Sequence, residues 1–189
     1  MTEARLHMEI KDLIRSRRTI HQFEPGNLPA EAVVRAAMEQ SVWAPNHYLT
    51  QPWRFYLLGE QSKERICLLN ARLVNDKQGE RAADIKLRRW REVPGWLALT
   101  CLKSDDAVTM QENYASCCCA AQNLMLLLWD EGIGVKWTTG AVTRTREFYH
   151  IIGADPDRED IVGLFWYGFP AEVPAAERPP LEQVLTQLP

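Results

Sequence analysis

Apolar side chains recur at helical spacing along several parts of the chain. Near the N-terminus, apolar residues three or four positions apart predict a helix that ends near Arg17; they are Leu6, Ile10, Leu13 and Ile14. The same spacing, with proline and glycine at the boundaries, predicts four more helices. They cover Ala30–Ser41, Gln61–Arg72, Thr143–Ile151 and, near the end of the chain, Leu181–Leu188.

Short apolar runs bounded by turn residues predict strands over Trp53–Leu58, Trp96–Leu102 and Asp160–Phe169. Val135–Thr139 fits either a short strand or an extended loop. Strands therefore alternate with helices, which indicates an α+β or α/β protein. We expect a central mixed, mostly antiparallel sheet flanked by helices.

The longest predicted helix, Val108–Glu131, is apolar nearly all round from Cys117 to Trp129. A helix without a polar face is buried on every side. This segment is therefore either a central helix or one shared with a second copy of the chain. In contrast, Asn75–Arg91 is the most highly charged stretch, and it fits a solvated helix or a mobile flap over a site.

Composition narrows the protein class. A chain of 189 residues has room for about one domain, and we expect a single domain over 1–189. A net charge of −3 and a pI of about 5.8 argue against nucleic-acid binding. Seven tryptophans are many for this length, and large flat side chains suggest a partner surface or a flat ligand.

The cysteines and the N-terminus indicate a reduced, cytoplasmic protein without a membrane anchor. Five cysteines make a poor disulfide framework, and we expect them to be small buried apolar residues in a reducing compartment. The N-terminus resembles no signal peptide, and no apolar stretch reaches the ~20 residues that a membrane helix needs. The four histidines, His7, His21, His47 and His150, are too scattered to predict a metal site.

Four local groups of residues remain as candidate chemistry. Arg17-Arg18-Thr19 suits a phosphate, because guanidinium groups make charge-assisted pairs with phosphate oxygens; the alternative is cations placed at a helix C-terminus. The segment from Trp43 to Trp53 presents amide, imidazole and indole groups, or is simply a packed turn. Gly132–Gly140 could cradle a flat heteroaromatic ring, and Arg178 stands alone in sequence.

Together, and in this order, these groups resemble the nitroreductase family of FMN-dependent oxidoreductases, in its compact single-domain branch. The matching segments are SRRTIHQF, APNHYLTQPWRF, GIGVKWTTG, VGLFWYGFP and RPPLEQV, which span nearly the whole chain. The resemblance implies a nitroreductase-like fold and a homodimer with FMN at the subunit interface. It also implies ping-pong hydride transfer through flavin N5, from NADH or NADPH to a nitroaromatic, quinone or other small oxidised acceptor.

The resemblance also implies which residues hold the flavin, and it names no catalytic side chain. The FMN phosphate and ribityl chain would be held by Arg17, Arg18, Thr19 and Arg178. Trp43 and His47 would approach from the partner subunit, and Gln51 would lie near the pyrimidine ring or the ribityl chain. The other edge would be lined by Trp137, Thr138, Thr139 and Gly140, with a backbone N–H near Thr139–Gly140 at N5.

Three positions depart from the family pattern. Thr19 stands where the family usually has a serine, and it keeps the hydroxyl. His21 stands where the family usually has a basic residue, and Leu49 stands where it usually has an asparagine. Leu49 cannot hydrogen-bond the flavin edge. A flavin-binding or flavin-free protein of the same fold, without turnover, is therefore the alternative function.

Overall fold

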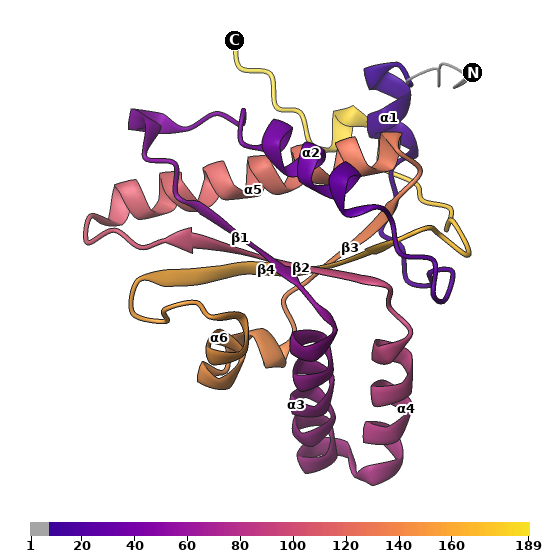
Figure 1. Cartoon of the computed structure of the whole chain (residues 1–189). Helices are drawn as coiled ribbons and strands as arrows, with labels where there is room; N and C mark the ends of the chain where they lie inside the picture. The colour runs from indigo at the N-terminus through magenta and orange to yellow at the C-terminus, as the bar shows by residue number, and fades with distance from the viewer. Residues whose placement is uncertain (1–7) are drawn as a thin grey trace.

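The computed structural model describes residues 8–189, and its centre is a four-stranded antiparallel sheet with helices on both faces (Figure 1). The strands are β1 (Trp53–Leu58), β2 (Gly95–Leu102), β3 (Gly134–Thr138) and β4 (Glu159–Gly168), in the order β1-β2-β4-β3. The helices are α1 (Ile10–Ser16), α2 (Glu31–Ser41), α3 (Glu60–Gln78), α4 (Glu80–Arg91), α5 (Ala107–Asp130) and α6 (Arg146–Ile152). The expected α+β class is confirmed.

Both faces of the sheet are covered. Helices α2 and α5 lie on one face, and α3, α4 and α6 lie on the other (Figure 1). Leu97 and Leu99 of β2 point into the first layer, whereas Trp96 and Ala98 point into the second. Because β2 is central and buried on both faces, it reads as a continuous apolar run rather than an alternating one.

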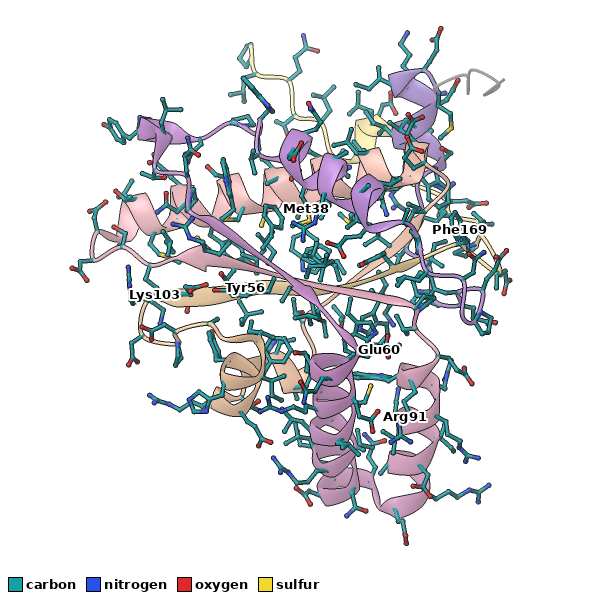
Figure 2. All side chains as sticks on the ribbon, in the orientation of Figure 1. Met38, Tyr56, Glu60, Arg91, Lys103 and Phe169 are labelled. Atoms are coloured by element: carbon teal, nitrogen blue, oxygen red, sulfur yellow. The ribbon has the colours of Figure 1, made fainter. Side chains whose placement is uncertain are left out.

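The two layers can be located in Figure 2 by one labelled side chain each. Met38 of α2 packs on the first layer, and Tyr56 of β1 belongs to the second. A register shift between Leu99 and Thr100 gives β4 one extra residue opposite β2. This bulge places both Val162 and Phe165 in the first layer.

The strand predictions hold to within one residue, and the strand option for 135–139 is confirmed. The helix predictions need three corrections. The charged stretch is two helices, because Gly79 has φ +84° and interrupts the run between α3 and α4. The segment 143–151 is a short 3₁₀ turn followed by α6, whose N-terminus is capped by the Thr145 hydroxyl, which accepts from the Phe148 N–H. Leu6 lies outside the described residues.

The third correction concerns the end of the chain. The predicted helix Leu181–Leu188 is wrong, because only Leu181–Gln183 form a 3₁₀ turn and the rest of the segment has no regular secondary structure and is exposed. An eight-residue segment gains little from helix formation unless its apolar face packs on something. In one chain these leucines have nothing to pack on.

Within one chain, helix α5 is not buried on every side. Leu124 and Leu128 are fully buried against the sheet, but Tyr114 and Cys119 are exposed on the outer side. The sheet and α2 cover only part of the helix, since α5 lies in an outer layer of one chain (Figure 1). The central-helix interpretation is therefore wrong. The cysteine prediction is also wrong for Cys119, and Cys118 is only half-buried.

A buried polar group links three strands. The carboxylate of Glu159, only 8% exposed, accepts hydrogen bonds from the Tyr56 hydroxyl at 2.8 and 2.9 Å and from the Thr100 hydroxyl. Burial, and then the hydrogen bond and charge of Glu159, raise the pKa of Tyr56 from 10.0 to about 12. A buried carboxylate needs these donors, because desolvation without them is costly.

Tyr56→Phe should lower the free energy of unfolding by about 1–3 kcal/mol, since Glu159 loses a donor. A rise to alkaline pH should also lower the free energy of unfolding of this variant by less than it lowers that of the natural protein. The folded pKa of Tyr56 is raised, so its contribution is complete below pH 10 and is lost as pH rises towards about 12. Urea unfolding at about pH 8 and about pH 11 checks both statements. The first statement would be contradicted by equal free energies of unfolding of the two proteins at about pH 8. The second would be contradicted if both proteins lost the same free energy of unfolding between about pH 8 and about pH 11.

Candidate functional site

The first candidate group lies where α1 ends. The Arg18 guanidinium donates hydrogen bonds to the backbone carbonyls of Arg15 and Arg17 at 2.6 and 2.9 Å. It therefore satisfies carbonyls at the C-terminus of α1, where a cation also favours the helix dipole. The helix-end interpretation of the two arginines thus applies to Arg18.

Arg17 is in a different environment. Its guanidinium is half-buried, and within residues 8–189 it has no hydrogen-bond or ion-pair partner. Burial, followed by the charges of Arg178 and Arg18, lowers its pKa. The structure therefore brings Arg17 near Arg178, although the two lie far apart in sequence. Two neighbouring cations without a carboxylate form a site for an anion such as a phosphate.

The segment after Arg17 runs along the outer edge of β3. Thr19 forms an isolated parallel bridge with Val135, and the Ile20 N–H donates to the Val135 carbonyl at 3.1 Å. Beyond Val135 this edge of β3 has no strand partner in the described chain. Edge strands present free N–H and C=O groups. Thr139 lies four residues further on, so these groups extend about 13 Å from the Thr19 bridge.

Trp137 points inward rather than away from the sheet. Its indole Nε1 donates to the Val162 carbonyl at 3.0 Å, and its ring centroid lies 5.2 Å from that of Phe165. The indole thus rests over β4 in the first layer, and Gly163 makes room for it. Thr139 and Gly140 follow as exposed residues. Thr139 also lines a cavity of about 540 Å³ with Tyr114 and Arg144.

Gly163→Ala should destabilise the fold by about 1–3 kcal/mol, because a Cβ at this position overlaps the Trp137 indole and would break its bond to Val162. Urea unfolding measures the loss. Gly59→Ala is the matched control, since nothing lies within 4 Å of a Cβ there. Similar stabilities for the two variants would show that Trp137 is not held by this contact.

The second candidate group is a loop at the other edge of the sheet, before β1. Asn46 organises it: its amide donates to the Ser116 hydroxyl at 3.2 Å and accepts from the Gln51 N–H at 2.7 Å. His47 Nδ1 lies 2.7 Å from a Glu112 carboxylate oxygen. These contacts hold the loop on α5 while Trp43 stays 83% exposed.

The backbone of this loop is strained. Tyr48, Leu49 and Gln51 have φ of +55°, +51° and +46°, in the left-handed region that non-glycine residues rarely adopt. Tyr48 and Leu49 are also about four-fifths exposed. Strained, exposed apolar residues in a loop whose other side chains are bonded to α5 are typical of a binding element.

One chain does not bring the two groups together. The loop with Trp43, His47 and Gln51 precedes β1, and the group with Arg17 and Thr139 lies at β3, the opposite edge. Three inter-strand spacings put at least about 14 Å between these edges. One half of the predicted site therefore consists of Arg17, Arg18, Thr19, Arg178 and the β3 residues. The loop before β1 forms the other half.

Sequence reasoning missed the supporting residues. Glu112 fixes His47, Ser116 fixes the loop, and Gly163 accommodates Trp137. Each acts across a long sequence separation, so no local pattern marks it. In residues 8–189 no group of three or more His, Cys, Asp or Glu could hold a metal ion. Nor does any helix of this range combine the length and apolar composition of a membrane span.

Comparison with known proteins shows which sequences this chain resembles. The sequence profile of the nitroreductase family matches residues 14–169. The candidate NAD(P)H nitroreductase YfhC of Bacillus subtilis (strain 168) is 28% identical over 187 residues, which are 96% of this chain and 95% of that protein. The candidate NAD(P)H nitroreductase YdjA of Escherichia coli (strain K12) is 24% identical over 170 residues, which are 86% and 89% of the two chains.

Solved structures show the same fold. A nitroreductase-like family protein from Bacillus cereus superposes with a TM-score of 0.83 at 24% identity, over 97% of both chains. A candidate nitroreductase from Desulfovibrio desulfuricans in complex with FMN superposes with a TM-score of 0.74 at 20% identity, over 97% of this chain and 99% of that one.

Proposed function

This chain belongs to the nitroreductase family, and from that premise we propose that it is an FMN-dependent NAD(P)H oxidoreductase. Its acceptor would be a nitroaromatic, a quinone or another small oxidised molecule. The observation that carries the proposal is the half-buried Arg17, which lies near Arg178 without an acidic partner in the described chain. A flavin phosphate supplies the negative charge that this pair lacks.

The residues present fit FMN along its length. Arg17, Arg178 and the Thr19 hydroxyl would hold the phosphate and the start of the ribityl chain. The open edge from Trp137 to Gly140 offers backbone donors and the Thr138 and Thr139 hydroxyls to a flat ring. FMN, when bound, supplies the two-electron chemistry that connects NAD(P)H with the acceptor.

The protein's own contribution is orientation and electrostatics. The N–H groups near Thr139–Gly140 lie between the end of β3 and the 3₁₀ turn Ala141–Arg144, and these two elements limit how far they must reorganise during the reaction. The arginine pair anchors the cofactor at the other end, so the ring cannot slide along the edge. No side-chain nucleophile or general base is required, and we assign none.

We further propose that the active form is a homodimer. The loop residues Trp43, His47 and Gln51 can reach a flavin held at β3 only from a second chain, given the width of the sheet. Exposed apolar side chains support this arrangement. They include Trp43, Tyr48, Leu49, Tyr114, Leu181, Val184 and Leu188. A monomeric protein rarely exposes so many large apolar residues in connected segments.

The visible spectrum of the purified protein tests the proposed cofactor. We expect flavin absorption bands, retained after gel filtration, and steady NAD(P)H oxidation when a nitroaromatic or quinone is added. Protein that is colourless and stays colourless after incubation with FMN would contradict the proposal.

The alternative is a protein of this fold without turnover. Leu49 motivates it, because this side chain has no hydrogen-bonding group and stands exposed at a left-handed position. Bound flavin without NAD(P)H-dependent turnover, across nitroaromatic and quinone acceptors, would favour this alternative. Steady turnover excludes it.

A further inference from the structure

Two thiols meet where α5 packs on β2, in the first layer of the core. Cys101 of β2 and Cys117 of α5 are both fully buried there. The Cys117 Sγ lies 3.9 Å from the carbonyl oxygen of Thr100, the residue that precedes Cys101. The two thiols are also hydrogen-bonded to each other. The fold therefore pairs two cysteines that lie far apart in sequence.

The other three cysteines lie in different surroundings. Cys67 is buried in the second layer, on the opposite face of the sheet. Cys118 is half-buried, and Cys119 is exposed on the outer side of α5. These three residues are controls for the pair, because Cys67 matches its burial and the other two match its place on α5.

Their contact makes the two buried thiols unequal. The hydrogen bond from Cys117 lowers the pKa of Cys101, whereas the same contact, followed by burial, raises the pKa of Cys117. A thiolate reacts with oxidants far faster than a thiol does. Cys101 is therefore the sulfur that an oxidant attacks first, and Cys117 lies beside it as the resolving thiol.

Cys101 lies beside the end of the loop that precedes β1. It is paired with Trp53, the first residue of β1, in the β1–β2 register. The next residue, Leu102, donates its N–H to the Pro52 carbonyl at 2.7 Å. The end of β2 that carries Cys101 therefore holds the last residues of this loop.

Cys117 lies beside the residues of α5 that hold the rest of the loop. Ser116 precedes it and accepts a hydrogen bond from the Asn46 amide at 3.2 Å. One turn earlier, Asn113 accepts from the Thr50 hydroxyl at 2.5 Å. The two cysteines therefore join the two elements to which the loop is bonded, and the distance between these elements sets the position of the loop.

We propose that hydrogen peroxide converts this pair to a reversible Cys101–Cys117 disulfide, and that the bond displaces the loop before β1. The Cys101 thiolate attacks peroxide, so that the O–O bond breaks, hydroxide leaves and a sulfenic acid forms on Cys101. The Cys117 thiol then attacks this sulfur, the S–S bond forms and water leaves. Peroxide thus takes two electrons and two protons from the two thiols and becomes two water molecules. An external dithiol reverses the step by thiol–disulfide exchange.

The bond acts on the loop through distance. An S–S bond is about 2.0 Å long, much shorter than a contact between sulfurs that are not bonded. Its formation draws the turn of α5 that carries Cys117 and Ser116 towards the end of β2. Asn46 must follow Ser116 or lose its hydrogen bond to it. The loop is one half of the proposed flavin site, so oxidation should also weaken FMN binding; only this consequence rests on the proposed function.

Peptide mapping by mass spectrometry tests the disulfide on the purified whole chain. The double variant Cys118→Ala, Cys119→Ala is used, so that the remaining cysteines are Cys67, Cys101 and Cys117. The protein is treated with hydrogen peroxide, alkylated in denaturant and digested. We expect Cys101 and Cys117 in one cross-linked species that dithiothreitol removes, and Cys67 in its alkylated form. Peroxide-treated protein without a Cys101–Cys117 cross-link overturns the proposal.

Hydrogen–deuterium exchange tests the effect on the loop in the same double variant. Oxidation should speed exchange in residues 43–51 by at least about threefold, because N–H groups held through Asn46, such as that of Gln51, lose protection. Dithiothreitol should reverse the change. A further Cys117→Ala substitution should abolish the response, and Cys67→Ala, the equally buried control, should keep it. An unchanged exchange rate in protein that carries the disulfide overturns the displacement.

FMN affinity is a separate measurement that distinguishes the two proposals. Protein that binds FMN when reduced, and at least about tenfold more weakly when it carries the disulfide, supports both. Protein that binds no FMN in either state contradicts the proposed function, while the cross-link and the exchange rates still decide the disulfide.

Discussion

Replacing Arg17 with alanine is expected to weaken FMN binding by roughly 30- to 1,000-fold, or about 2–4 kcal/mol. The effect is large because Arg17 is half-buried and has no other partner in residues 8–189 to compete with the phosphate. Charge-assisted bonds from a partly desolvated guanidinium are among the stronger polar contacts in proteins. Fluorescence titration of the apoprotein with FMN measures the change.

Arg17→Ala should also affect the flavin-free protein in a characteristic way. Without FMN, Arg17 is repelled by Arg178 and Arg18, so its removal should leave the stability of the apoprotein unchanged or slightly higher. A purely structural arginine would give the opposite result. Arg15→Ala is the control, because Arg15 is exposed in the last turn of α1 and is not among the charges that lower the pKa of Arg17. Equal FMN affinities in Arg17→Ala and Arg15→Ala would contradict the phosphate assignment.

Mixing two defective variants is expected to restore about one quarter of the natural activity. One variant is Arg17→Ala, and the other carries Trp43→Ala together with His47→Ala. If each flavin site takes Arg17 from one chain and the loop from its partner, a mixed dimer holds one intact site and one doubly defective site. About half of randomly formed dimers are mixed, and half of their sites are intact.

The measurement is NAD(P)H oxidation after co-expression of the two variants, compared with each variant alone. All three substitutions lie at exposed or half-exposed positions, so the fold should tolerate them. No recovery in the mixture, when two differently tagged variants co-purify and so form mixed dimers, would place both halves of the site in one chain. A monomeric mass at micromolar concentration would contradict the proposed dimer.

Local patterns in the sequence were sufficient for most of the fold. Residues 53–58 and 96–102 are short, mostly apolar runs bounded by glycine or proline, which is the pattern of a strand. Prediction failed where the outcome depends on contacts with distant residues. The end of the chain has helical spacing, yet Leu185 and Leu188 find no surface to pack on in one chain and form no helix.

The candidate site also has features that the sequence predicts and features that depend on contacts between distant residues. The sequence alone determined the residue types: arginines and a hydroxyl for a phosphate, a glycine-rich segment for a flat ring, and an aromatic loop, in an order typical of one family. Only the tertiary structure decided how they are used. Arg18 caps α1, Arg17 is half-buried under the charge of Arg178 without a partner in residues 8–189, and Trp137 turns inward. The physical reason is that residue type fixes what a group can bind, whereas burial and long-range neighbours fix which group is left without a partner.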